Sequence, residues 1–474
     1  NRRHEAEALL GFRQLLEEKL FSPDVVTFTI VLGACATLGG HENVVVEGEI
    51  NCIVFQEIGR ALHSHIRKKN VILDAFINDA MVNMYGKCGS VREAIYVLET
   101  SREHSIASWN SVLTTYLCRD EGAHVLLLYR EMQKQGFRPD FHSFVSALRA
   151  CTILIDGEED IKLKFFISLE IGNALHLDAI RKDLVSNVYV ANALISMYGK
   201  CGNTFGAENV FSLLPSHDVV TWNAMLSMYV QHFQVGNAFH IFRQMLNEEI
   251  HQDMLTFVIA LKACGTLVDS DNITSNCAQG TKAIAYDIGQ AIHAHIRKRH
   301  CFSSNIYINN TLISMYGKCG DISRAEHVFQ SLHKPDVVSW NAMLSAYVEH
   351  GKAGKGLQLY REMKINNENP NKLTYVICLQ ACGSLADDED GKFPKLALLD
   401  IGQAFHVEIW KKGLLSDVVM DSALVSMYGK CGMILEAETV FNSELIQRNS
   451  VTWNAMMSAY IEHGYAGKAL ELYT

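Results

Sequence analysis

The apolar residues of this chain recur at the spacing of amphipathic helices. In the segment 188–218 they form two helical faces, Val190, Leu194, Ile195 and Tyr198, and then Ala207, Val210, Phe211 and Leu214. Gly199 and Gly202 lie between the two faces, and glycine permits the left-handed conformation in which many helices end. The segment therefore predicts two antiparallel helices joined by a tight turn.

Two short phrases repeat along the chain at a nearly constant interval. The hexapeptide Met-Tyr-Gly-Lys-Cys-Gly occurs four times without a change, at residues 84–89, 197–202, 315–320 and 427–432. Trp-Asn follows it each time, at residues 109–110, 222–223, 340–341 and 453–454. Two phrases in phase over the whole chain indicate a tandem array, in which each unit packs only on its neighbours. The 474 residues are thus predicted to form one continuous all-α array.

Each superunit of the array divides into three helical hairpins. The long hairpins are predicted at 25–74, 141–187, 254–305 and 372–417. The hexapeptide hairpins are predicted at 75–105, 188–218, 306–336 and 418–449, and the tryptophan hairpins at 106–140, 219–253 and 337–371. Complete triplets therefore span 25–140, 141–253 and 254–371, a pair follows at 372–449, and partial tryptophan hairpins are expected at 1–24 and 450–474.

The long hairpins carry extra residues between their two helices. We expect inserted loops at about 39–57, 153–170, 268–287 and 386–400. The inserts hold 17 Asp and Glu against 5 Lys, whereas the whole chain has a net charge of −10, so the repeat framework itself is slightly basic. Basic residues such as Arg67 and Lys68 recur at the ends of the second helices, where they either complement the helix dipole or form a track for phosphates.

Residues that could carry chemistry follow the repeat instead of a catalytic pattern. Eight of the thirteen cysteines fall at two repeat positions, one cysteine per position in each unit. This spacing forms no CxxC pair, so we predict no metal site, and the histidines shared by the long hairpins are expected at interfaces or on the surface. We likewise expect no catalytic residue, no cofactor and no membrane span, and both ends of the chain look cut.

The motifs around the two phrases resemble those of a known repeat family. The segments VVTWNAMLSMYVQHFQVGNAFHIFRQMLNEEIHQD and VYVANALISMYGKCGNTFGAENVFSLLPSHD resemble the P and S motifs of pentatricopeptide-repeat proteins. The long hairpins resemble the L motif of that family with an insertion, and no unit carries the W-x2-L-G-x2-Y pattern of tetratricopeptide repeats. Because the order L-S-P recurs, the chain is similar to the PLS subclass. The resemblance implies a right-handed superhelical solenoid of antiparallel two-helix repeats.

The resemblance further implies binding of single-stranded organellar RNA, with one nucleotide per repeat. In the family, the fifth residue of the first helix and the last residue of the repeat select the base. The corresponding pairs are Asn110–Asp140, Asn223–Asp253, Asn341–Asn371, Asp79–Ser105, Asn192–Asp218, Asn310–Asp336 and Ser422–Asn449. In the long hairpins they are Thr29–Asp74, Val145–Asn187, Val258–Asn305 and Val376–Asp417, and Asn454 holds the fifth position of the last, incomplete hairpin. A fifth-position asparagine alone could instead cap a helix or lie on the surface.

Family rules assign a base to most of these pairs. Asn with Asp selects uracil, Asn with Asn favours cytosine, Ser with Asn selects adenine, and Thr with Asp selects guanine. The predicted RNA is G-n-U-n-U-U-n-U-C-n-A from 5′ to 3′, where n marks the valine repeats and the repeat of Asp79. The second residue of each repeat separates the bases with an apolar side chain, a role that suits Tyr189, Val220, Tyr307, Val338, Val419 and Val451 but not Ala107 or His142.

For a chain of the PLS type, the resemblance implies that the array positions C-to-U RNA editing in a mitochondrion or chloroplast. Editing-complex proteins, or a deaminase supplied in trans, would then be further partners. The array itself is not expected to be an enzyme, and the H-x-E and C-x-x-C signature of the zinc deaminases does not occur in this sequence. Two alternatives stay open: a factor for RNA processing, splicing or stability without editing, and a helical scaffold that binds proteins.

Overall fold

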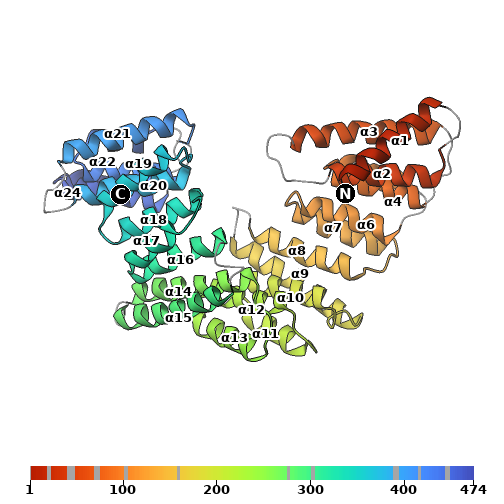
Figure 1. Cartoon of the computed structure of the whole chain (residues 1–474), viewed down its shortest axis with the longest axis horizontal. Helices are drawn as coiled ribbons and strands as arrows, with labels where there is room; N and C mark the ends of the chain where they lie inside the picture. Colours follow the sequence, from red (N-terminus) through yellow and green to blue (C-terminus); the bar gives the residue numbers. More distant parts are fainter. Residues whose placement is uncertain are drawn as a thin grey trace. The chain divides into compact units, whose positions relative to one another are not determined.

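The computed structural model describes residues 2–18, 23–39, 48–68, 75–100, 105–156, 161–274, 278–299, 305–387, 394–414, 418–443 and 449–473. The regular elements in these ranges are all helices, from α1 (Arg2–Glu18) to α25 (Ala466–Tyr473), as Figure 1 shows. The helices form two compact units, residues 1–232 and 233–474. Within the described residues no helix is both long enough and apolar enough to cross a bilayer.

The first unit contains two layers of helices. The first helices of its hairpins are α2 (Val25–Gly39), α4 (Ala75–Lys87), α6 (Ile106–Leu117), α8 (Phe141–Ile155), α10 (Val188–Lys200) and α12 (Val219–Gln231). The second helices are α3 (Gly48–Lys68), α5 (Val91–Thr100), α7 (Gly122–Lys134), α9 (Ile161–Arg181) and α11 (Thr204–Leu213). Each first helix packs against the next first helix, and each second helix packs against the first helices before and after it.

The second unit repeats this arrangement. After α13 (Val235–Asn247), its first helices are α14 (Met254–Thr274), α16 (Ile306–Cys319), α18 (Val337–Glu349), α20 (Lys372–Ala386), α22 (Val418–Lys430) and α24 (Ser450–Glu462). Its second helices are α15 (Ala278–Lys298), α17 (Ile322–Gln330), α19 (Ala353–Ile365), α21 (Lys395–Lys411), α23 (Ile434–Phe441) and α25. In both units each hairpin of the sequence-based division starts at the first residue of a helix.

The hexapeptide ends the first helix of its hairpin, as its glycines predict. Gly320 has φ +90° and caps α16, with its N–H directed to Gly317 O and Tyr316 O. The corresponding glycines of the other three copies also have positive φ, a conformation that glycine adopts without steric cost. The methionine of the hexapeptide packs under a glycine of the preceding second helix: a Cβ at Gly289 would lie 2.6 Å from Met315 Sδ.

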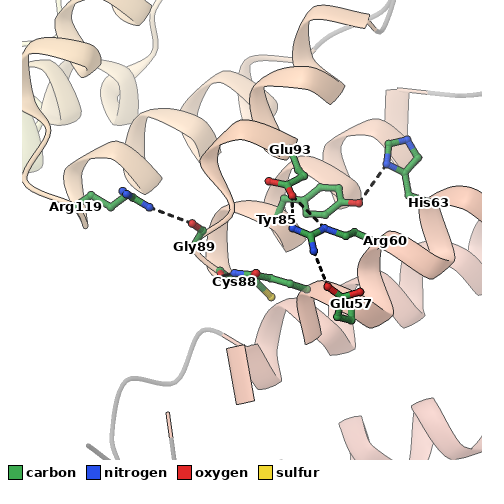
Figure 2. A network of polar contacts seen from close by, with 9 residues as sticks. Glu57, Arg60, His63, Tyr85, Cys88, Gly89, Glu93 and Arg119 are labelled. Atoms are coloured by element: carbon green, nitrogen blue, oxygen red, sulfur yellow. Dashed lines mark hydrogen bonds and ion pairs between the residues drawn. The ribbon is translucent and has the colours of Figure 1, made fainter. Parts of the chain in front are cut away.

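The tyrosine of each hexapeptide joins the long hairpin to the hexapeptide hairpin. Tyr85 Oη lies 3.3 Å from His63 Nδ1 (Figure 2), and the equivalent distances are 2.8, 2.8 and 2.9 Å at His176, His293 and His406. Burial lowers the pKa of all four imidazoles, to about 4 at His293, so that each ring is neutral at neutral pH when it hydrogen-bonds its tyrosine. The prediction that these histidines lie at an interface is confirmed.

Two arginines extend this network across three hairpins of the first unit. Figure 2 shows Arg60 of α3 between Glu57 and Glu93, with an Nη1–Oε1 distance of 2.6 Å to Glu57. Arg119, in the turn after α6, donates to Gly89 O at 3.3 Å. Gln56 Nε2 of α3 donates to Cys88 O at 2.5 Å, so the hexapeptide turn is held by side chains of the hairpins before and after it.

The inserts are in large part helical, and the prediction of loops there is wrong. Helix α14 continues to Thr274 and α15 starts at Ala278, while α3, α9 and α21 start at residues 48, 161 and 395. Of the predicted inserts, 40–47, 157–160, 275–277 and 388–393 lie outside the described residues. Extending an existing helix satisfies the backbone N–H and C=O groups at no further nucleation cost, which an irregular loop cannot do.

One basic residue at the end of each long second helix contacts an aromatic ring of the protein: Arg67, Lys182, Arg299 and Lys412. Lys182 Nζ lies 5.1 Å from the ring centroid of Phe144, and Lys412 Nζ lies 5.3 Å from that of Tyr375. Lys412 also donates to Pro370 O at 3.1 Å. Such cation–π and carbonyl contacts favour a structural role for these residues over a track for phosphates.

Candidate functional site

Grooves run along the first helices within each unit. In the first unit a groove of about 910 Å³ is lined by α2, α4, α6 and α8 and contains Thr29, Asp79, Asn110 and Asp140. In the second unit a groove of about 540 Å³ at α14, α16 and α18 contains Asn310, Asp336, Asn341 and Asn371. Another of about 510 Å³ at α20, α22 and α24 contains Ser422, Asn449 and Asn454. The residues predicted to select bases therefore collect on the same surfaces.

The last residue of a hairpin is the N-cap of the helix that follows. Seven of these residues accept the N–H of the third residue of that helix at 2.8–3.1 Å: Asp24, Asp140, Asp218, Asp253, Asp336, Asn371 and Asn449. Carboxylate and amide oxygens are favoured caps because the first N–H groups of a helix lack intrahelical partners. The capping role considered for the fifth residue thus belongs to the last residue.

The amide of the fifth residue donates to this cap. Asn110 Nδ2 lies 3.0 and 3.1 Å from the two carboxylate oxygens of Asp140. The distance is 3.0 Å from Asn310 Nδ2 to Asp336 Oδ1, and 3.5 Å from Asn192 Nδ2 to Asp218 Oδ1. Each predicted pair is thus a direct contact in these hairpins.

The pair of Asn341 and Asn371 shows which atom the cap presents. Asn341 Nδ2 donates to Asn371 Oδ1 at 3.0 Å, and the same Oδ1 accepts from Thr374 N at 3.1 Å. Because the cap must offer an acceptor to the helix N-terminus, the orientation of the Asn371 amide is fixed. An asparagine cap and an aspartate cap therefore present an oxygen to the fifth residue alike, and they differ in the second atom, Nδ2 or Oδ2.

A buried hydroxyl binds the other side of the fifth-position amide. Asn110 Oδ1, Asn310 Oδ1 and Asn341 Oδ1 accept from Ser143, Ser339 and Thr374 at 2.6, 2.6 and 2.7 Å. These hydroxyl residues are the third residues of α8, α18 and α20, and all three are fully buried. Sequence reasoning missed them because they belong to the next hairpin, although their recurrence at one helix position was a usable signal.

The remaining predicted residues have other contacts. Asp79 accepts from Ser105 at 2.7 Å and also from Ser108, whereas Ser422 Oγ lies 2.8 Å from Thr452 Oγ1. Thr29 donates to Val25 O at 2.8 Å.

Some predicted pairs stay predictions. Asn223 belongs to the first unit and Asp253 to the second, so this pairing is untested. Asp74 and Asp417 lie outside the described residues. Asn454 is exposed in its groove at the end of the array.

The aspartate caps are negatively charged at neutral pH. Burial alone would raise the pKa of Asp140, but hydrogen bonds from Ser143 and Asn110 lower that pKa below its ordinary value. The same balance of burial against hydrogen bonds lowers the pKa of Asp218 and Asp336. Such carboxylates can only accept hydrogen bonds, so their free lone pairs offer acceptors beside the fifth-position amide.

The second residue of every first helix from α2 to α24 is exposed. Ten of these twelve side chains are large and apolar: Val26, Phe76, Tyr189, Val220, Leu255, Tyr307, Val338, Leu373, Val419 and Val451. The other two are Ala107 and His142. Single exposed apolar residues are ordinary, but a row at one helix position within each unit is a surface suited to apolar or stacking contacts. Val26, Phe76, Leu255 and Leu373 extend the row that the sequence predicted.

Lys87, Lys318 and Lys430 of the hexapeptides also line the grooves, and three of the four hexapeptide lysines are paired. Lys200 Nζ and Lys430 Nζ lie 2.6 Å from carboxylate oxygens of Asp156 and Asp387, and Lys318 pairs with Asp269. These aspartates share one position, the sixteenth residue of a long hairpin, where the first long hairpin has Gly40. No ion pair of Lys87 occurs among the described residues, and this lysine is exposed in the groove of the first unit.

One buried carboxylate close to the groove has a raised pKa, in contrast to the lowered pKa of the aspartate caps. Asp421, the fourth residue of α22, is 2% exposed, and burial raises its pKa to about 6. Asn78 and Asn309 occupy the same helix position in α4 and α16. An amide is therefore compatible with this site.

Asp421→Asn is expected to stabilise the protein at pH 7 by about 1–3 kcal/mol, because a buried charge is removed. The folded-state pKa lies above the ordinary aspartate pKa of 3.8, so the folded state binds the proton more tightly than the unfolded state. Stability is then lost as the pH rises from about 4 through about 6. Thermal melts of wild type and variant between pH 4 and 8 test this. Exposed Asp400 supplies the control Asp400→Asn, and an equal loss with pH in wild type and Asp421→Asn would contradict the assignment.

Two descriptions of the same repeat match the chain. "PPR repeat family" matches residues 217–266 and 335–384. "PPR repeat" matches residues 79–106, 107–137, 189–219, 310–334, 422–443 and 451–474. The matched segments together cover more than half of the chain.

Plant proteins with the same repeat match nearly the whole chain. Pentatricopeptide repeat-containing protein At5g27110 of Arabidopsis thaliana is 30% identical over 98% of this chain and 59% of its own length. The chloroplastic protein At4g18520 of that species is 30% identical over 88% of this chain and 61% of its own length. The mitochondrial protein At3g02330 is 30% identical over 89% of this chain and 45% of its own length. The chain thus spans about half to three fifths of the length of these relatives.

A solved structure shares the fold. The chain superposes on a crystal structure of the pentatricopeptide repeat protein PPR10, a maize protein, in complex with an 18-nucleotide psaJ RNA element. The TM-score is 0.51 at 17% identity, over 98% of this chain and 70% of that one. This likeness shows an all-helical array of paired repeats. Together with the repeat matches and the plant relatives, it makes the chain a member of the pentatricopeptide-repeat family.

Proposed function

We propose that the grooves of the first helices bind single-stranded RNA sequence-selectively, with one nucleotide per hairpin. The observation that carries the proposal is the recurring contact between the fifth-position amide and the N-cap of the next helix, at 3.0–3.1 Å in three hairpins. Repeat proteins that use two or three side chains per repeat select bases one at a time. The RNA bound by PPR10 in its crystal structure is consistent with this activity in the family.

The cap geometry supports a distinction between two pyrimidines. An aspartate cap has a second acceptor, Oδ2, whereas Asn371 has the donor Nδ2 at that place. Uracil carries a donor at N3 and cytosine an acceptor, so the aspartate caps suit uracil and Asn371 suits cytosine. We therefore assign uracil to the hairpins of Asn110, Asn192, Asn223 and Asn310, and cytosine to the hairpin of Asn341.

The other positions follow the same reasoning and the family rules. Thr29 with Asp74 is assigned guanine and Ser422 with Asn449 adenine. Val145, Val258 and Val376 cannot hydrogen-bond a base, so the proposed target is G-n-U-n-U-U-n-U-C-n-A. The exposed apolar second residues supply contacts to the faces of the bases, which are sequence-tolerant.

In the cell, we propose that the array selects an organellar transcript for C-to-U editing. The order of long, hexapeptide and tryptophan hairpins supports the PLS subclass, and relatives described as chloroplastic or mitochondrial support an organelle. A deaminase or editing-complex proteins would act on the bound RNA in trans. A role in RNA processing, splicing or stability would use the same grooves and the same RNA.

Binding of the proposed 11-nucleotide RNA tests the function. Fluorescence anisotropy should give an affinity at least about tenfold higher for this RNA than for a scrambled strand of equal composition, since each wrong base costs about 1–3 kcal/mol. The affinity should fall with salt, with a slope of about −0.7 per neutralised phosphate.

The double variant Asn310→Ala with Asn341→Ala is the matched control, because it removes two selecting amides and leaves every lysine in place. Its preference for the target over the scrambled strand should be smaller than that of the wild type but not lost, because the other selecting hairpins remain. Equal affinity of the wild type for both strands would reject selective reading. A complete lack of RNA affinity would leave the protein-binding scaffold as the better account of the array.

A further inference from the structure

The hydroxyl at the third position of a first helix recurs only after certain hairpins. Where the preceding fifth residue is Asp, Asn or Ser, the third residue is Ser or Thr: Ser108, Ser143, Thr221, Thr256, Ser339, Thr374 and Thr452. Where the preceding fifth residue is valine, the third residue is apolar, namely Val190, Ile308 or Met420, and apolar Ile77 likewise follows the hairpin of Thr29. The match therefore holds between a third-position hydroxyl and a fifth residue of Asp, Asn or Ser, whereas an apolar third residue follows all four long hairpins.

The contacts explain this match. In three hairpins the hydroxyl lies within 2.6–2.7 Å of the Oδ1 of the fifth-position asparagine. Ser143, Ser339 and Thr374 are fully buried, so no water competes for the bond at these residues. A fifth-position amide with its oxygen on the hydroxyl and its nitrogen on the cap cannot rotate without losing both bonds.

We infer that the third-position hydroxyl is a positioning residue for base selection. It acts through the fifth residue, by fixing which atoms of the amide remain for the base. The inference rests on the proposed RNA binding and adds a third member, from the following helix, to the selecting pairs of Asn110, Asn310 and Asn341. Without the hydroxyl, the amide oxygen would be buried unpaired or would turn toward the groove and change the donor and acceptor pattern there.

The hydroxyl also takes part in capping, which is a purely structural role. Ser339 and Thr374 form capping boxes with Asp336 and Asn371. Thr27 Oγ1 makes the equivalent bond to its cap Asp24 at 2.6 Å, and within the described part of the chain Thr27 hydrogen-bonds no fifth-position amide. Thr27 therefore offers the capping bond without the contact to an amide.

Thr374→Val tests the inference, because it removes the hydroxyl and keeps the shape. The readout is the ratio of affinities for RNAs with cytosine or uracil at the ninth nucleotide of the proposed target, opposite Asn341. The ratio should fall about five- to tenfold, the equivalent of one hydrogen bond. Ratios at the eighth and eleventh nucleotides should not change, and Thr374→Ser should restore the wild-type ratio.

Two controls separate positioning from capping. Thr27→Val should lower stability as Thr374→Val does and change no ratio. Thr221→Val should change the uracil preference at the fifth nucleotide less, since Thr221 bonds Asp218 and the described residues offer Asn192 Oδ1 no hydrogen-bond partner. An unchanged ratio in Thr374→Val, with the wild type still preferring the target over the scrambled strand, would overturn the inference alone. A wild type without that preference would instead refute the proposed function.

Discussion

Asn371→Asp is expected to change the preference at the ninth nucleotide from cytosine to uracil, with the ratio of affinities shifting about tenfold or more. The capping bond holds Oδ1 of residue 371 on Thr374 N in either form, at 3.1 Å in the wild type. The substitution therefore exchanges only the second atom, a donor Nδ2 for an acceptor Oδ2. Loss of a matched hydrogen bond and gain of a buried mismatch at a charged acceptor together correspond to about 1.5–3 kcal/mol.

The reverse substitution in the neighbouring hairpin is the natural control. Asp336→Asn should shift the preference at the eighth nucleotide from uracil toward cytosine, because Asn310 and its cap have the same geometry as Asn341 and its cap. Competition binding with four RNAs, carrying each pyrimidine at each position, measures both changes at once. If either substitution alters total affinity while its own ratio stays constant, the second atom of the cap does not select the base.

Trp340→Ala is expected to be the most destabilising single change considered, by about 3–5 kcal/mol. Trp340 is 4% exposed, and its ring meets that of Phe329 edge to face with a centroid distance of 5.0 Å. The same T-shaped contact at 5.0 Å recurs between Phe211 and Trp222 and between Phe441 and Trp453. The tryptophan thus fills the junction between a hexapeptide hairpin and the next tryptophan hairpin, and alanine would leave a large cavity there.

The loss of stability caused by Trp340→Ala should be local at first, since each hairpin of an array contacts only its neighbours. Hydrogen exchange followed by mass spectrometry should show faster exchange in α16 to α19 and wild-type rates in α22 to α25. Val338→Ala provides the comparison: this residue lies two positions away and is 53% exposed, so its truncation should leave exchange unchanged. Similar exchange in both variants would mean that Trp340 does not hold the junction.

The helices and their starting residues could be predicted because the sequence presents the same hairpins several times. Each copy of the hexapeptide shows the end of a first helix, and each Trp-Asn shows the fourth and fifth residues of one. Asn341 and Asn371 could likewise be placed in the groove by counting from these phrases. The periodicity of a repeat transfers directly to helix boundaries, since local contacts dominate such folds.

Other features depend on contacts that counting does not reveal. The bond from Thr374 to Asn341 joins residues 33 apart in the sequence, and only the packing of α18 on α20 brings them together. The helical continuation of α14 to Thr274 was hidden by its polar, acidic composition, which is typical of loops as well as of exposed helices. The capping role of the last residues was missed because Asp and Asn serve equally well in turns, caps and binding sites.

The pairing of the hexapeptide lysines has a consequence for the energetics of RNA binding. Four identical lysines suggest four equal attractions for the phosphate backbone, but Lys200, Lys318 and Lys430 already have carboxylates of the long hairpins as counterions. A paired lysine must leave its carboxylate before it can bind a phosphate, and the carboxylate then attracts a cation from solution. This uptake offsets the cation released from the RNA, so the share of a paired lysine in the salt dependence is reduced. A chain that is periodic in its helices is therefore aperiodic in its charge. If the array binds RNA as proposed, we expect Lys87, which has no ion pair among the described residues, to contribute the largest share of the salt dependence among the four hexapeptide lysines.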